Sequence, residues 1–185
     1  MAADTLLNDF ELPFQLYDVL GTESLTEHAK FSEHSRETFD AVLETANKIA
    51  TDLFLPHNHI ADKNEPQFDG KKVSMINDVK VAFDAFRESG FIAGRYSFED
   101  GGMQLPETVM TAVAGYFMAA NPSTTAYPFL TTAAINVISH FASDDIKAAF
   151  MPRMLTGEFT GTMALTEPHA GSSLADIKTI AVKQD

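Results

Sequence analysis

Apolar side chains recur three and four residues apart along most of the chain from residue 35 onward, which is the period of an amphipathic α-helix. The clearest segment ends near Pro56, and its apolar residues are Phe39, Val42, Leu43, Ala46, Ile49, Ala50 and Leu53. Ser35 is placed to cap this helix, with Thr38 at the position where a Glu would complete a capping box. This spacing predicts that most of the chain forms packed helices.

Further helices are predicted over residues 73–89, 106–120, 124–141 and 143–155. Pro106 stands where a first helical residue can be proline. Residues 124–141 are apolar on most sides, which predicts a buried helix. Residues 58–72 are polar and rich in turn formers, and residues 91–105 contain Gly101-Gly102, so both segments are predicted to be loops.

The character of the sequence changes after Gly157. Residues 159–166 are rich in Thr and other strand formers, and residues 178–182 alternate between polar and apolar, so β structure is expected to begin here. The predicted fold class is therefore mostly α, a helical domain followed by the start of a β domain. The predicted divisions are an N-terminal extension (1–34), a helical domain (35–157) and the opening of a middle β domain (158–185). Within the extension, residues 12–20 form an apolar lead-in expected to pack on the rest.

Charge and composition exclude several classes of function. The 185 residues carry 26 Asp and Glu against 13 Lys and Arg, a formal net charge of -13, which disfavours nucleic acid and anionic lipid as partners. The absence of Cys excludes disulfides, thiolate metal sites and a Cys nucleophile from these residues. The first basic residue is Lys30, so neither a secretory nor a mitochondrial leader is recognisable, and no apolar run has membrane-spanning length. A cytoplasmic location is expected.

One short stretch carries chemical information, because it places a strand directly before a turn of small residues. Pro168 keeps Glu167 extended, and the small residues after it leave backbone amides and hydroxyls accessible. Loops of this kind bind planar polar rings and phosphates, although an ordinary strand-to-turn corner would give the same pattern. The stretch comprises Met163, Ala164, Leu165, Thr166, Glu167, Pro168, His169, Ala170, Gly171 and Ser172.

The run from Leu165 to Ser172, with residues 174–179 behind it, closely resembles the signature of the acyl-CoA dehydrogenases. Residues 150–161 resemble the helix and approach strand that lead to that signature, and residues 90–92 with Gly101-Gly102 resemble a glycine-rich loop between early helices of the family. The N-terminal lead-in is similar to the extension of the larger bacterial members. The resemblance spans most of the chain.

This resemblance implies a three-domain flavoprotein of which these residues cover the helical domain and the opening of the β domain. FAD would lie along residues 163–172, with Thr166 at the polar edge of the flavin ring and Ser172 where flavin and acyl-CoA meet. The family usually has Asp after that serine, whereas this chain has Ser173, and His169 stands at a variable position. Both departures leave the binding stretch intact.

The reaction implied by the family begins when a carboxylate removes a proton α to the thioester. The β-hydride passes to flavin N5 and a trans-2-enoyl-CoA results. The family's base is a Glu of the C-terminal domain, so no residue here is expected to be catalytic, and Glu167 is expected to be structural. An electron-transferring flavoprotein as acceptor and a homodimer or homotetramer are also implied.

The substrate pocket implied by the family is floored by residues 126–133, with Tyr127, Phe129 and Leu130 as candidates; plain core packing explains each equally well. His57, His59 and Asp62 lack a convincing further ligand, so no metal site is expected. The alternatives are an acyl-CoA oxidase, a flavin-binding paralogue without catalysis, and a helical binding module without catalysis.

Overall fold

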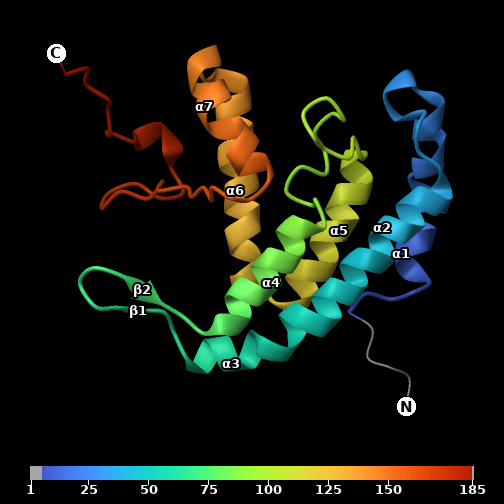
Figure 1. The fold of residues 1–185 in the computed structure, drawn as a ribbon, viewed down its shortest axis with the longest axis horizontal. Coiled ribbons are helices and arrows are strands. Elements are labelled where there is room, and N and C mark those ends of the chain that lie inside the picture. The colour runs from blue at the N-terminus through green and yellow to red at the C-terminus, as the bar shows by residue number, and fades with distance from the viewer. Residues whose placement is uncertain (1–5, 185) are drawn as a thin grey trace.

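A computed structural model describes residues 6–184; residues 1–5 of the predicted extension, and Asp185, lie outside this range. Helices account for most of the ordered backbone, with one small hairpin at the side (Figure 1). The helices are α1 (Glu11–Pro13), α2 (Arg36–Ile49), α3 (Asn58–Lys63), α4 (Asn77–Glu88), α5 (Glu107–Ala120), α6 (Pro122–Phe141) and α7 (Asp144–Leu155), and the strands are β1 (Gln67–Phe68) and β2 (Val73–Ser74). The prediction of a mostly helical fold is confirmed.

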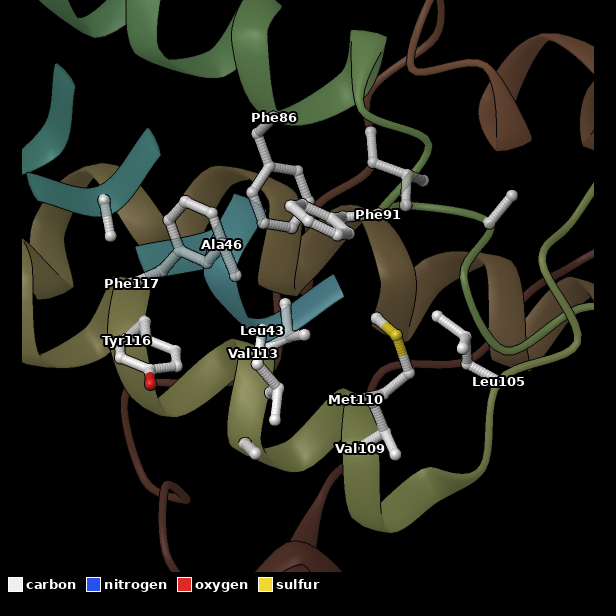
Figure 2. Packing of buried hydrophobic residues seen from close by; sticks show 14 of the residues in the cluster. Leu43, Ala46, Phe86, Phe91, Leu105, Val109, Met110, Val113, Tyr116 and Phe117 are labelled. Carbon is white, nitrogen blue, oxygen red and sulfur yellow. The ribbon is translucent and has the colours of Figure 1, made fainter. Parts of the chain in front are cut away.

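The centre of the molecule is α5, which packs against α2 on one side and α6 on the other. Phe117 of α5 is fully buried and meets Phe54 and Phe86 edge to face, each with ring centroids 4.8 Å apart. Phe91 meets Phe86 at 5.5 Å in the same orientation. These aromatic pairs join segments that are far apart in the sequence and form the core beneath the helices, and Figure 2 shows Phe86, Phe91 and Phe117 together there.

Helix α2 begins as predicted, and its cap is more complete than expected. The Ser35 side chain accepts the Thr38 N–H at 3.3 Å, while the Thr38 hydroxyl accepts the Ser35 N–H at 3.4 Å. Thr38 thus takes the part that a Glu usually plays in a capping box. The predicted end near Pro56 is wrong. A π-helical turn (Ala50–Phe54) and a 3-10 turn (Leu55–His57) carry the chain into α3, since Pro56 stands at the start of a turn where no N–H is needed.

The predicted loop at residues 58–72 and the predicted helix start at residue 73 need correction. Residues 58–63 are helical, and β1 and β2 form an antiparallel hairpin that pairs Phe68 with Val73. The Asp69 carboxylate accepts the N–H groups of Lys71 and Lys72 at 2.8 and 2.7 Å, which fixes the turn. Because Val73 and Ser74 pair with β1 in this hairpin, they do not form the first helical turn, and α4 starts only at Asn77.

The loop between α4 and α5 contains the glycine pair at which a positive φ was predicted. Gly101 adopts a φ of 78°, and a Cβ on Gly102 would lie 2.2 Å from the Tyr96 carbonyl oxygen. Pro106 is the residue just before α5 and not its first helical residue. Residues 12–19 are helical, and Leu16 is buried in the core, as expected of a lead-in that packs on the rest.

Two predictions for the later chain are wrong. Helix α6 is buried on one face only, since Phe129, Val137 and Phe141 are 58%, 47% and 85% exposed. Residues 159–166 and 178–182 form no strand within the described part, and the nearest β pairing is an isolated bridge between Glu167 and Ala170. A strand needs a neighbouring strand to pair with its backbone groups, and no described residues form one beside these two segments. Their place in Figure 1 is the red arm beyond α7.

Candidate functional site

The predicted binding stretch reaches its place by crossing α6. After α7 the chain turns, and the Phe159 N–H donates to the Arg153 carbonyl at 2.9 Å while the Arg153 guanidinium lies 3.7 Å from the centre of the Phe159 ring. Two residues later the Gly161 N–H donates to the Thr131 hydroxyl of α6 at 3.2 Å. The approach to residues 163–172 is therefore fixed on the helix that carries the predicted substrate residues.

Contact at this crossing is close. A Cβ on Gly161 would lie 2.5 Å from the Cβ of Ala134, so no larger residue fits without movement. Thr131 is fully buried, and its hydroxyl donates to the Tyr127 carbonyl at 2.8 Å, which leaves an oxygen lone pair for Gly161. Thr131 anchors the approach to the binding stretch, and the sequence analysis did not identify it. A Thr inside an apolar helix gives no sign of the group to which its hydroxyl bonds.

Residues 162–166 form an exposed strip beyond this crossing. Met163 and Leu165 are 42% and 40% exposed, although both are apolar. Among residues 6–184 no hydrogen bond occupies the backbone N–H groups from Met163 to Thr166. A strip with apolar side chains and open donors can bind a flat ring that carries acceptor atoms at its edge.

A tight turn follows the strip. Glu167 and Ala170 exchange two backbone hydrogen bonds of 2.8 and 3.2 Å around Pro168 and His169. A Cβ on Gly171 would lie 3.7 Å from the Thr166 side chain, so the chain after the turn returns close to the strip. The turn thus brings Ser172 and its neighbours back beside the residues that precede it.

The carboxylate of Glu167 closes a larger loop. It accepts the Lys178 N–H at 3.0 Å, the Thr179 N–H at 2.8 Å and the Thr179 hydroxyl. His169 Nε2 lies 3.3 Å from the same carboxylate, whose side chain is only 12% exposed. The Thr179 hydroxyl, followed by the backbone N–H groups of Lys178 and Thr179, lowers the pKa of Glu167. An ionised, fully engaged carboxylate of this kind holds structure and is poorly placed to move a proton.

The predicted substrate residues on α6 are divided between two sides of the helix. Tyr127 lines a cavity of about 380 Å³ that α6 shares with α3, α4 and the residues on either side of the hairpin. Phe129 lines a separate cavity of about 180 Å³ between α4, α5 and α6. Leu130 is partly buried and lies one turn before Ala134, on the side where Gly161 crosses. By helical spacing, Tyr127 and Leu130 lie on the same side of α6 as Thr131 and Ala134, which Gly161 contacts, and Phe129 does not.

Buried polar contacts fix the start of α6. The Asn121 side chain accepts the Thr124 N–H and donates to the Phe54 carbonyl, both at 3.1 Å. His57 is buried; its Nδ1–H donates to the Leu53 carbonyl at 2.7 Å, so its Nε2 accepts the Thr124 hydroxyl at 2.8 Å. His57 thus holds the start of α6 in place through its bond to Thr124. Within residues 6–184 no three or more metal-ligating side chains lie close enough together to bind an ion.

In the described part of the chain no helix combines the length and the apolar character needed to cross a membrane.

Comparison with known proteins gives the same family that the residues indicate. The family model for the N-terminal domain of acyl-CoA dehydrogenases matches residues 36–158. A 3-methylmercaptopropionyl-CoA dehydrogenase of Ruegeria pomeroyi is 33% identical over 155 residues, which is 84% of this chain and 26% of the relative. A butyryl-CoA dehydrogenase of Syntrophomonas wolfei is 31% identical over 146 residues, 77% of this chain and 24% of the relative.

A broad-specificity linear acyl-CoA dehydrogenase of Mycobacterium tuberculosis is 28% identical over 173 residues, 92% of this chain and 28% of the relative. The chain belongs to the acyl-CoA dehydrogenase family, a family of oxidoreductases. It spans about a quarter of the length of these curated relatives.

Proposed function

We propose that this chain is part of an FAD-dependent enzyme that dehydrogenates acyl-CoA thioesters to trans-2-enoyl-CoA. The observation that carries the proposal is the exposed strip at residues 162–166, which is anchored on α6 and leads into a turn of small residues. Family membership supports the same activity. In this proposal residues 35–157 form the helical domain, and residues 158–185 open the middle β domain after an extension at 1–34.

The residues present fit a flavin. Met163 and Leu165 offer exposed apolar contact, and the open N–H groups around Thr166 can donate to the acceptor atoms of the ring edge. Ala170, Gly171 and Ser172 are small enough to let the ligand approach the backbone. Bound FAD supplies the two-electron acceptor that the protein residues lack. The part of this chain is to hold and orient that group.

Substrate binding is assigned to the side of α6 that meets this strip. Tyr127 and Leu130 would contact the acyl group, Ser172 would contact the thioester, and Phe129 would act from the neighbouring cavity by supporting the helix. The names of two relatives refer to butyryl-CoA and 3-methylmercaptopropionyl-CoA. Thioesters with short acyl groups are therefore the first substrates to test.

The remaining parts of the proposal concern the whole protein. The catalytic base would be a Glu supplied by sequence beyond these 185 residues, because the carboxylate nearest the strip, that of Glu167, is occupied by the loop. The electron acceptor would be an electron-transferring flavoprotein, the assembly a homodimer or homotetramer, and the compartment the cytoplasm.

The test is the visible absorption spectrum of the protein expressed from its whole gene, recorded anaerobically before and after addition of an acyl-CoA. Flavin bands that bleach with butyryl-CoA or a related thioester support the proposal. Rapid recolouring in air with hydrogen peroxide release would favour an acyl-CoA oxidase. Bands that never bleach would favour a non-catalytic paralogue, and absence of flavin would favour a helical binding module.

A pair of variants localises the effect. Thr166→Val removes a hydroxyl from the strip, whereas Thr156→Val makes the same change at the end of α7, where the hydroxyl donates only to the Arg153 carbonyl. We expect Thr166→Val alone to weaken retention of FAD.

A further inference from the structure

The carboxylate of Glu167 joins backbone that is 11 and 12 residues away in sequence. Oε1 accepts the N–H and the hydroxyl of Thr179, and Oε2 accepts the Lys178 N–H at 3.0 Å. His169 Nε2 approaches Oε2 at 3.3 Å. Hydrogen bonds to an ionised acceptor are about twice as strong as those between neutral groups. One side chain thus closes the loop from residue 167 to residue 179.

Internal contacts also order this loop. Glu167 and Ala170 are bridged by backbone hydrogen bonds at its start, and the Ser173 hydroxyl donates to the Asp176 carboxylate at 2.7 Å near its end. A Cβ on Gly171 would lie 3.7 Å from the Thr166 side chain, so these two residues are close. The position of Ser172 relative to the strip therefore depends on how the base of the loop is fixed, and Glu167 fixes it.

The strip is anchored at its other end by α6. The Gly161 N–H donates to the buried Thr131 hydroxyl at 3.2 Å, five residues before Thr166. Residues 162–166 lie between this anchor and the Glu167 carboxylate, with open N–H groups along them. A strip held at both ends presents its donors in a set geometry before any ligand arrives, which reduces the entropy lost on binding.

We propose that Glu167 is a positioning residue for the flavin: its carboxylate, bonded to Lys178 and Thr179, holds the strip and the Ala170–Ser172 turn in the form that binds FAD. This inference rests on the proposed function and adds a residue that acts through others, without contact to the reacting atoms. Its partner on the loop is Thr179, whose hydroxyl and N–H both bond to the carboxylate.

The experiment uses the protein expressed from the whole gene, with FAD removed and then titrated back while flavin fluorescence is followed. The variants are Glu167→Gln, which keeps the shape and removes the charge, Thr179→Val, which removes one donor, and Thr179→Ser, which restores it. Glu158→Gln is the matched control, because Glu158 bonds to Arg153 at the end of α7 and, among the described residues, makes no hydrogen bond or ion pair with residues 167–179.

We expect the Kd for FAD to rise about tenfold in Glu167→Gln, the scale of a lost hydrogen bond to a charged group. A smaller rise is expected in Thr179→Val, with wild-type values in Thr179→Ser and Glu158→Gln. The visible circular dichroism of bound flavin should shift in Glu167→Gln and Thr179→Val. A loss of stability away from the flavin site would leave this spectrum unchanged. Amide exchange at residues 178 and 179 of the FAD-free protein should accelerate in Glu167→Gln.

Each result decides something. A wild-type Kd and wild-type dichroism in Thr179→Val would overturn the inference, even if Glu167→Gln failed to fold. Unchanged FAD binding in a folded Glu167→Gln would overturn it directly while leaving the proposed function in place. A wild-type protein that binds no FAD would overturn the proposed function and this inference together.

Discussion

Asn121 is the most informative single position for stability, because one buried amide caps α6 and ties it to the segment before α3. Asn121→Ala removes the cap on the Thr124 N–H, which costs about 1 kcal/mol. It also leaves the Phe54 carbonyl, bonded at 3.1 Å in the native protein, without its donor, at about 1–3 kcal/mol. The exposed fraction of Asn121 is 0%, so water has no ready access to replace either partner. The expected loss is about 2–4 kcal/mol.

Ser35→Ala provides the control, since Ser35 caps α2 in the same way but is exposed to water. Its loss is expected to be about 0.5–1 kcal/mol. Urea unfolding of the chain, followed by far-ultraviolet circular dichroism, measures both. With a slope of about 2 kcal/mol per molar, the midpoint should fall by about 1–2 M for Asn121→Ala and by less than about 0.5 M for Ser35→Ala. Equal shifts in the two variants would refute the argument from burial.

Phe117→Ala should lower the free energy of unfolding by about 3–5 kcal/mol in the same assay, because it opens the core between Phe54 and Phe86. Gly161→Ala should lift the strip from α6 and weaken FAD binding in fluorescence titrations of the whole-gene protein, while Gly115→Ala, with its nearest neighbour at 3.5 Å, should not. Bonding to the loop lowers the pKa of Glu167, so the closed loop gains stability above its ordinary pKa and loses it as pH falls through the lowered value. Amide protection at residues 178 and 179 should therefore decline as the pH falls through this lowered pKa in wild type and show no such step in Glu167→Gln.

Helical periodicity predicted most of the fold because each long helix buries a face whose spacing is visible in the sequence. The errors fall where local bonding or helix continuation decides the backbone. Asp69 builds a hairpin turn from its own side chain, and Pro56 starts a new helical turn where it was expected to end one. Neither outcome follows from apolar spacing, since both depend on which of two short-range structures satisfies more backbone groups.

The candidate site was predictable as a stretch but not as an arrangement. The order of residues 163–172 indicated a ligand-binding turn, yet the contacts that hold it come from Thr131 and from Thr179. Thr131 lies in an apolar helix and Thr179 at the end of the family-like stretch, and in neither place does the sequence show which group the threonine bonds to. The structure was also needed to show that Tyr127 and Phe129 line different cavities on two sides of α6, because both residues are aromatic and only two positions apart.

The strand expected at residues 159–166 is absent for a reason that bears on function. A backbone in this conformation must bond its N–H groups to a neighbouring strand, to side chains, to water or to a ligand. Here Gly161 bonds to Thr131, and the turn at Glu167 closes on itself, whereas the N–H groups of residues 163–166 stay open among the described residues. Because no neighbouring strand pairs with residues 163–166, the strand prediction is wrong and these N–H donors remain available. The bond from Gly161 to Thr131 and the turn at Glu167 hold the segment in place at its two ends. A neighbouring strand and the edge of a bound flavin would both need these N–H groups as donors. The N–H groups that a strand leaves unpaired are therefore the ones that remain for the flavin.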